Sequence, residues 1–320
     1  MDQHAGAMTR RMDTAEHFLL VTLSNIGDVL MTTPVMEVLH RQHPGAMMDI
    51  VADPRSCELL EHCPYRDHLV HRDKQQGLRG TLALVKQLRQ RRYDLIVDLR
   101  TDGLAWLLRA RHRCTRQGGK RSTGHAVERH LGVIARYTGI SEIPPTRIWL
   151  TAAEHSHARH LLSGLPGKRW LAIGPGARWE PKRWPVRQFR ELAQIQADHF
   201  DAMILLGSGD DAAHCRKIAA GLSLPCLDLA GRTSLLQAAA LLQQMRIFIG
   251  NDSGLGHLAA AVDIPTVTVF GPGEPERYHP WNRRGVWLRS QTGRIADLPA
   301  GGVADAVTAL LERSTYKGIH

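Results

Sequence analysis

Residues 246–261 read RIFIGNDSGLGHLAAA, and this stretch decides the fold class. RIFI is a short apolar run typical of a buried strand, and LGHLAAA has the composition of a helix. The five residues between them, GNDSG at 250–254, hold two glycines, an amide, a carboxylate and a hydroxyl. A buried strand that turns directly into a helix is typical of a parallel α/β sheet. The stretch predicts such a sheet, with a polar loop at this strand end.

The same alternation of strand and helix runs along the chain. Stretches with helical spacing of apolar residues, such as 28–42 and 78–92, separate short apolar runs. Strands in this arrangement lie mainly parallel in a sheet, with helices on both faces. The predicted strands are 17–23, 47–52, 94–99, 170–176, 202–209, 246–252 and 266–273.

The alternation is interrupted between about 140 and 168, where SEIPPTRIWL and SGLPGKR carry proline and glycine. A chain of 320 residues with 43% apolar content is long enough for two domains of ordinary size. We therefore predict an α/β protein with two Rossmann-like, doubly wound domains, at 1–165 and 166–320. We expect the last helix, at about 302–313, to pack back on the first domain.

The chain is basic, with 41 Lys and Arg against 31 Asp and Glu, a net charge of +10. This balance favours an anionic partner, which is nucleic acid, a lipid headgroup layer or a phosphorylated substrate. Aromatic residues make up only 5% and no RNA-binding signature occurs, which disfavours nucleic acid. No strand is followed by GxGxxG, which disfavours a dehydrogenase.

The cysteines and the N-terminus indicate a cytosolic protein. Five cysteines without a CxxC pair are typical of reduced thiols. The segment MDQHAGAMTRRMDTAEH lacks the apolar core of a signal peptide, and no stretch approaches 18 uncharged apolar residues. We expect a soluble cytoplasmic protein, and attachment to a membrane surface stays open. The cysteines are Cys57, Cys63, Cys114, Cys215 and Cys226.

Four loops that follow predicted strands are unusually polar or rich in glycine. They are SNIGD at 24–28, GPGARWEPKRW at 174–184, GSGDD at 207–211 and GNDSG at 250–254. Ligands of open parallel sheets bind beyond the carboxyl ends of the strands, at loops of this kind. Three of the four loops fall in the second half, which favours a nucleotide or phosphate site there.

The loop GNDSG and the helix after it have the features of an anion site. Asp252 can cap the helix, and Ser253 with the free amides of the first turn can face a ligand. His257 follows Ser253 by four residues and shares its face of the helix, so it can donate a hydrogen bond to a docked anion. The alternative is a capped helix whose histidine is satisfied in the core.

The other loops supply charged groups. Lys182 can neutralise a diphosphate leaving group, unless it is a solvated loop lysine. Asp210 or Asp211 can accept hydrogen bonds from ribose hydroxyls. Asp28 opens a helix in the first half, where a carboxylate is usually a cap. The same position lies across the interdomain cleft from GNDSG, so Asp28 can also act as a general base towards an incoming hydroxyl.

Four motifs occur in order: GDVLMTTP at 27–34, GPGARWEPKRWP at 174–185, GNDSGLGHLAAA at 250–261 and FGPGEPERYHPW at 270–281. Together they resemble glycosyltransferase family nine, the ADP-heptose:lipopolysaccharide heptosyltransferases, over about residues 17–313. The resemblance implies a GT-B fold, whose second domain binds ADP-heptose and whose first binds the acceptor. It also implies transfer with inversion at the anomeric centre, without a metal.

The resemblance assigns roles residue by residue. Asp28 matches the proposed base, and Lys182 matches the lysine near the donor phosphates, so both are predicted catalytic residues. The D-[ST]-G-x-x-H donor signature is matched at 252–257. The predicted donor-binding residues are Gly176, Arg183, Asp211, Asp252, Ser253, Gly254 and His257.

The basic stretch RARHRCTRQGGKR at 109–121 is a solvated or nucleic-acid-facing run in the simplest interpretation. The resemblance favours contact with the phosphates and acidic Kdo sugars of the acceptor, or with an anionic membrane surface. HSHARH at 155–160 is interpreted as a polar helix near the linker rather than a metal site. The predicted acceptor-binding residues are Arg109, Arg111, Arg113, Arg116, Lys120 and Arg121.

The sequence thus predicts a metal-independent, inverting heptosyltransferase without a cofactor. It would move heptose from ADP-heptose to Kdo-lipid A or the lipopolysaccharide inner core, on the cytoplasmic face of the inner membrane. Two alternatives stay open. One is a GT-B enzyme that transfers or epimerises another nucleotide sugar, and the other is a basic nucleic-acid-binding protein.

Overall fold

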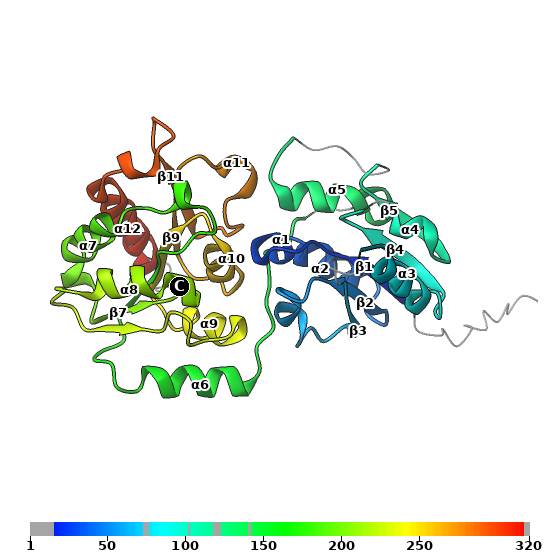
Figure 1. Ribbon diagram of the computed structural model, residues 1–320, viewed down its shortest axis with the longest axis horizontal. Helices are drawn as coiled ribbons and strands as arrows, with labels where there is room; N and C mark the ends of the chain where they lie inside the picture. Colours follow the sequence, from blue (N-terminus) through cyan, green and yellow to red (C-terminus); the bar gives the residue numbers. More distant parts are fainter. Residues whose placement is uncertain (1–15, 73–76, 102, 118–122, 140–141, 317–320) are drawn as a thin grey trace, which may run out of the picture.

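The computed structural model describes residues 16–72, 77–101, 103–117, 123–139 and 142–316. Two parallel sheets, each with its own helices, form two lobes (Figure 1). The first sheet has the strand order β3-β2-β1-β4-β5, and the second has the order β11-β10-β9-β6-β7-β8. The predicted pair of doubly wound α/β domains is confirmed.

The first domain contains five parallel strands. They are β1 (His17–Val21), β2 (Met47–Ala52), β3 (Arg66–His71), β4 (Tyr93–Asp98) and β5 (Ala110–Thr115). Its helices are α1 (Ile26–Leu30), α2 (Thr33–Gln42), the 3-10 turn η1 (Cys57–Leu60), α3 (Gly77–Leu88), α4 (Leu104–Leu107) and α5 (Ala126–Thr138).

The second domain contains six parallel strands. They are β6 (Trp170–Gly174), β7 (Ala202–Leu205), β8 (Cys226–Asp228), β9 (Ile247–Asn251), β10 (Thr266–Phe270) and β11 (Gly285–Arg289). Its helices are α6 (Ala152–Leu162), α7 (Val186–Ile195), α8 (Ala212–Ala219), α9 (Leu235–Leu242), α10 (Gly254–Ala261), α11 (Pro275–Tyr278) and α12 (Ala300–Tyr316), and its 3-10 turns are η2 (Glu180–Lys182), η3 (Ala197–His199), η4 (Gly209–Asp211) and η5 (Ile295–Asp297).

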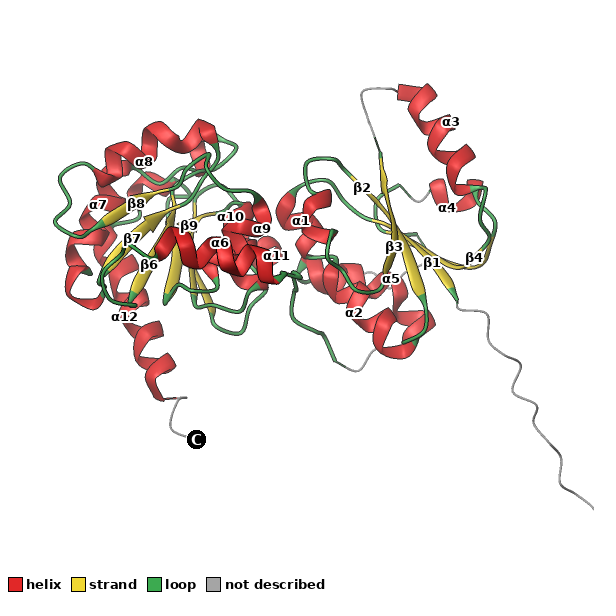
Figure 2. Cartoon of the chain, turned by 90° about the horizontal axis from the view of Figure 1, so that it is seen from below, coloured by secondary structure: helices red, strands yellow, loops and turns green. Residues whose placement is uncertain are grey.

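The strand β1 shows how the first sheet is covered on both faces. Successive side chains of a strand point to opposite faces. Phe18 and Leu20 pack with the helices α2 and α5, whereas Leu19 and Val21 pack with α3 and α4. The sheet therefore lies between two helical layers (Figure 2), and its apolar strands read as continuous runs because both faces are buried.

The predicted helix 28–42 is two helices, α1 and α2. The hydroxyls of Thr32 and Thr33 donate to the carbonyls of Val29 and Leu30 at 2.7 Å. Pro34, in the first turn of α2, has no N–H to continue the hydrogen-bond ladder of α1. The break leaves α1 as a short helix at the end of β1, beside the second domain.

Two helices pack differently from the prediction. Helix α6 lies against α9 of the second domain, through Ala158 and Leu162. The chain thus crosses between the domains before α6, ahead of the predicted boundary at 165. The last helix, α12, packs on α7 and β10 of the second domain through Val303 and Val307, which corrects the expected return to the first domain.

No helix in the described residues has the length and apolar character to span a membrane.

Candidate active site

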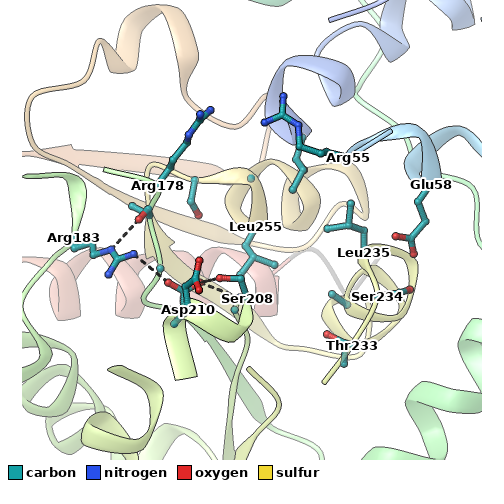
Figure 3. Close-up of a pocket in the computed structure, with 18 residues that line it drawn as sticks. Arg55, Glu58, Arg178, Arg183, Ser208, Asp210, Thr233, Ser234, Leu235 and Leu255 are labelled. Carbon is teal, nitrogen blue, oxygen red and sulfur yellow. Dashed lines mark hydrogen bonds and ion pairs between the residues drawn. The ribbon is translucent and has the colours of Figure 1, made fainter. Parts of the chain in front are cut away.

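The four polar loops meet at the facing carboxyl edges of the two sheets. Cavity I, of about 590 Å³, is lined from all four loops, by Ile26, Gly176, Ser208 and Ser253 among others. Figure 3 shows this cavity. Cavity II, of about 530 Å³, adjoins it and shares Ser253 and Gly254 with it. The four loops that the sequence singled out therefore lie around one pair of cavities.

Helix α10 begins at the seam between the cavities. Its N-cap residue is Ser253, whose hydroxyl is buried and has no hydrogen-bond partner in the described residues. Asp252 does not cap the helix, contrary to the sequence prediction, because its carboxylate is paired with the Lys182 ammonium. The first-turn amides of α10, which have no partner within the helix, are therefore not satisfied by a side-chain cap.

His257 lies one turn further along α10, at the wall of cavity II. Burial, with smaller contributions from the charges of His279 and Lys182, lowers the pKa of this imidazole to about 4. The ring is therefore neutral at pH 7, and its buried Nδ1 has no partner in the described residues. A neutral imidazole can donate one hydrogen bond and accept another.

Two glycines let the domains approach each other at the seam. A β-carbon at Gly27 would lie 2.5 Å from Cδ2 of His257, and one at Gly254 would lie 2.9 Å from Cβ of Ile26. Both distances are shorter than a carbon–carbon contact allows, so neither position accommodates a side chain without movement. Helices α1 and α10 pack across the cleft through these glycines (Figure 1).

The loop 175–184 is fixed to the end of β9 by a buried amide. The side chain of Asn251 donates to the Pro175 carbonyl at 2.7 Å and accepts from the Trp184 amide at 3.0 Å. Between these two anchors lie η2 and Lys182, whose ammonium reaches Asp252. The cation is thus held at the wall of cavity II by a folded loop rather than by a solvated one.

Asp211 and Gly176 touch each other at the wall of cavity I. Oδ2 of Asp211 accepts from the amide of Ser208 at 2.9 Å and from its hydroxyl at 2.7 Å. A β-carbon at Gly176 would lie 2.3 Å from the same oxygen. Arg183 completes the group, since it contacts Asp211 at 3.6 Å and donates to the Ala177 carbonyl at 2.8 Å (Figure 3). Asp211 therefore orders the loops, and the exposed Asp210 lines cavity I beside it.

Asp28 lies on the first-domain wall of cavity II. The N-cap residue of α1 is Asn25, and its side-chain amide donates to Oδ2 of Asp28 at 2.8 Å. No backbone amide of the described residues donates to this carboxylate, so Asp28 is not a helix cap. The carboxylate shares cavity II with Lys182, Asp252 and His257.

Comparison with known proteins identifies the family. The model of glycosyltransferase family 9, described as heptosyltransferase, matches residues 81–303, which is more than half of the chain. The match includes the three polar loops of the second domain. The chain belongs to glycosyltransferase family 9.

Relatives and solved structures agree with this family 9 assignment. The chain is 30% identical to lipopolysaccharide heptosyltransferase 3 of Escherichia coli strain K12, over 80% of this chain and 82% of that protein. The solved ADP-heptose lipopolysaccharide heptosyltransferase II of E. coli is 25% identical, with a TM-score of 0.79, over 93% of this chain and 99% of that one. The E. coli heptosyltransferase WaaC, solved with ADP, is 22% identical, with a TM-score of 0.75, over 92% of this chain and 99% of that one. The fold is GT-B, as the resemblance implied.

Several lining residues of this family 9 site lie outside the quoted motifs. Arg55 and Glu58 reach cavity I from the first domain, and Ser234 lines its second-domain side (Figure 3). Oε1 of Glu58 also accepts from the Leu236 amide of α9 at 3.1 Å, which joins the domains. These residues follow β2 and β8 or precede α9, where no glycine-rich loop marked them.

The residues of the basic stretch 109–121 lie in different surroundings in the structure. Arg109 precedes β5, at the sheet edge opposite the cleft, and Arg113 donates to the carbonyls of Ala105 and Leu108. Arg111 is exposed on β5, and Arg116 is exposed after the carboxyl end of β5. An acceptor role for these residues stays a prediction. Lys120 and Arg121 lie outside the described residues.

The histidines of α6 are not part of a metal-like cluster in the described residues. The group with metal-ligand spacing in that part of the chain is Asp49, Asp67 and His68, on the first sheet. Arg91 contacts both carboxylates of this group, so a guanidinium already occupies the cation position. The five cysteines are all unpaired, in agreement with the sequence.

Proposed function

We propose that this protein transfers heptose from ADP-heptose to the inner core of lipopolysaccharide, with inversion at the anomeric carbon and without a metal. The observation that carries the proposal is the junction of cavities I and II at Ser253 and Gly254, with Lys182 and Asp28 lining cavity II from opposite domains. Membership of family 9 and the heptosyltransferase activity named for the relatives support the substrate class.

The donor would extend across this junction. Its nucleoside would occupy cavity I, where Asp210 offers a carboxylate to ribose hydroxyls and Arg55 and Arg178 offer positive charge. Its diphosphate would lie at the start of α10, because free first-turn amides and the positive end of the helix dipole attract anions. The heptose would then lie in cavity II, near the neutral ring of His257.

Asp28 would act as general base. The acceptor hydroxyl attacks the anomeric carbon from the face opposite the diphosphate, and its proton passes to the carboxylate of Asp28. The new carbon–oxygen bond forms while the bond from the anomeric carbon to the phosphate oxygen breaks, which inverts the centre. Asn25 contacts only one carboxylate oxygen in the described residues, so the other oxygen is available for the proton.

The departing ADP gains negative charge as the bond to the sugar breaks. Lys182 is placed to stabilise that charge because the loop 175–184 and Asp252 already fix its position. Fixed donors aimed at developing charge lower the barrier without reorganisation during the reaction. In this proposal Lys182 and the α10 amides perform the task that a divalent metal performs in other transferases.

The acceptor would be Kdo-lipid A or a lipopolysaccharide core, held by the first domain at the cytoplasmic face of the inner membrane. Arg111 and Arg116 are exposed on that domain, and their guanidinium groups suit phosphates and acidic sugars. No nucleic acid and no cofactor take part in the proposed reaction.

Calorimetry of the purified protein with ADP, UDP and GDP tests the donor assignment. We expect ADP to bind with the highest affinity, and the same affinity and turnover after treatment with EDTA. A preference for UDP or GDP would overturn the ADP assignment. A loss of turnover on chelation that Mg²⁺ or Mn²⁺ restores would overturn the metal-free mechanism while leaving the donor assignment intact.

A further inference from the structure

Helices α3 and α4 expose an unusual number of large apolar side chains. Leu78 and Leu82 of α3 are 84% and 69% exposed, and Trp106 and Leu107 of α4 are 66% and 47% exposed. These four are the majority of the large exposed hydrophobic residues in the described chain. Exposed apolar residues gathered in one region of a monomer mark an interaction site. We call these four residues the α3–α4 patch.

The two helices form one surface. Their inward side chains, which include Leu84, Leu88 and Leu104, belong to a single apolar cluster against the first sheet. The Arg89 guanidinium at the end of α3 donates to the Leu107 carbonyl at 2.8 Å. Figure 2 shows α3 and α4 side by side on one face of the first domain. The patch is therefore the outer side of a helical layer whose inner side is core.

The apolar side chains of the patch are held in place. Arg113 donates to the carbonyls that flank Trp106, those of Ala105 and Leu108, and its guanidinium lies 5.6 Å from the centroid of the Trp106 ring. An exposed tryptophan stacked by an arginine keeps its ring at the surface. Leu78 and Leu82 are one helical turn apart and share a face of α3.

The two stretches of sequence that carry the patch are basic. Residues 77–92 contain five basic residues and residues 104–116 contain four, with no Asp or Glu in either stretch. The whole chain carries a net charge of +10, so these two stretches hold most of that excess. A cavity of about 430 Å³ beside the patch is lined by Arg89, Arg91, Arg92, Arg109 and Arg113.

We propose that the α3–α4 patch docks on an anionic lipid bilayer. Leucine and tryptophan side chains that enter the headgroup region, surrounded by lysine and arginine, are the recognition chemistry of helices that lie in a membrane interface. Each basic residue near an anionic leaflet strengthens binding, and the effect decreases within a Debye length. A protein partner for this face would need an acidic surface of the same size, whereas a bilayer supplies the charge and the apolar layer together.

The topology fits this orientation. Strand β3 ends at the cleft side of the first sheet and β4 starts at the far side, so α3 runs antiparallel to the strands and Leu78 lies at its cleft-side end. A helix of twelve residues is about 18 Å long. Leu78 therefore lies towards the same edge of the first sheet as the loops of that domain that line the two cavities. This part of the inference rests on the proposed transfer to a membrane-borne acceptor.

Flotation of the full-length protein with phosphatidylcholine vesicles, with and without phosphatidylglycerol, tests the inference. We expect binding to the vesicles that contain phosphatidylglycerol, with weaker binding at high salt. L78Q/L82Q should reduce the partition coefficient at least about tenfold, because two apolar side chains no longer leave water. R79Q/K86Q should reduce it by roughly thirtyfold, since each removed charge weakens binding about fivefold.

Matched controls come from the second domain. Ile195→Gln changes an exposed apolar residue outside the patch, and R216Q/K217Q removes two exposed charges of α8. Both should bind vesicles like the wild type. The proposal would be overturned if phosphatidylglycerol did not increase vesicle binding of the wild type. It would also be overturned if the patch variants bound vesicles as strongly as their controls. Self-association in sedimentation velocity that L78Q/L82Q abolishes would assign the patch to a second copy instead.

Calorimetry with ADP on the same variants separates this inference from the proposed function. L78Q/L82Q should keep the wild-type ADP affinity and melting temperature, since neither residue lines cavity I or II. If the protein binds vesicles through the patch but prefers another nucleotide, the docking surface is supported and the proposed donor is wrong. If it prefers ADP but does not bind vesicles through the patch, the donor is supported and the docking surface is wrong.

Discussion

The two walls of cavity II are built differently. On the second-domain wall, Lys182 is paired with Asp252 and its loop is anchored by Asn251. On the first-domain wall, Asp28 has one hydrogen-bond partner in the described residues, the side-chain amide of Asn25. Fixed charges suit the stabilisation of a leaving group, and a carboxylate with a free oxygen suits proton transfer. In the proposed mechanism the second domain would thus supply fixed charge and the first domain would supply the base.

The largest expected effect tests the first-domain wall. Asp28→Asn keeps the shape and the contact with Asn25 but removes the base, so turnover should fall by about 10²-fold to 10⁴-fold. ADP affinity should not change, because Asp28 does not line cavity I. Asn25→Ala is the matched control, since it removes the partner and keeps the carboxylate. Turnover of Asp28→Asn within a few fold of wild type would show that another group takes the proton.

Lys182→Ala tests the second-domain wall and should reduce turnover by about 10²-fold to 10³-fold, with weaker ADP binding. The change also leaves the Asp252 carboxylate without its cation. The double variant K182A/D252N removes both charges and separates the two causes. If Lys182 acts on the diphosphate, the double variant stays impaired. Recovery of turnover in the double variant would assign the loss to the unpaired carboxylate.

Asn251→Leu tests whether the second-domain wall is preorganised. The change leaves the Pro175 carbonyl and the Trp184 amide unpaired in the core, which costs about 1–3 kcal/mol for each group. Unfolding in urea should show this loss, and calorimetry should show weaker ADP binding because the loop of Lys182 loses its anchor. Asn282→Leu is the control. Asn282 also makes two hydrogen bonds, to Ile264 and Arg284, but lines neither cavity.

The smallest expected effect compares histidines on the two sides of the cleft. Burial lowers the pKa of His257 in the second domain and of His125 in the first to about 4, against about 6.5 in the unfolded chain. Between these values the unfolded chain binds more protons, so stability is lost as pH falls from 6.5 to 4 and the loss then stops. Each histidine should contribute at most ~3 kcal/mol to this loss. His257→Gln and His125→Gln should each flatten the dependence of the urea-unfolding free energy on pH, and an unchanged slope would contradict the assignment.

The sequence predicted the interior strands of the two sheets and missed the edge strands, for a physical reason. The seven strands predicted from sequence are the interior strands of the two sheets, and the four that escaped prediction, β3, β5, β8 and β11, are the edge strands. Interior strands are buried on both faces and form apolar runs. Edge strands carry polar residues, as in RDHLVH of β3 and ARHRCT of β5. The apolar-run criterion therefore detects burial rather than the strand itself.

The site was predictable where it lies at the ends of interior strands. Lys182, Asp211 and Ser253 follow β6, β7 and β9, so the loop rule placed them correctly at one edge of the second sheet. Arg55 and Arg178 were not singled out, because an arginine in a loop has no spacing that marks it. The domain on which α6 and α12 pack was not predictable. An amphipathic pattern shows that a helix has an apolar face, but it does not show which sheet that face covers.

The glycine contact between α1 and α10 has a mechanical consequence. It lies between the two cavities, and its surfaces meet so closely that a methyl group at Gly27 or Gly254 would collide with the opposite domain. The domains also touch on either side of this contact, where Glu58 accepts from the Leu236 amide and His125 contacts the His279 carbonyl. The glycines therefore set the spacing in the middle of a continuous interface, and a larger residue at either position would widen both cavities together. The grip on the nucleotide and the space for the sugar and its acceptor would then loosen in a single step.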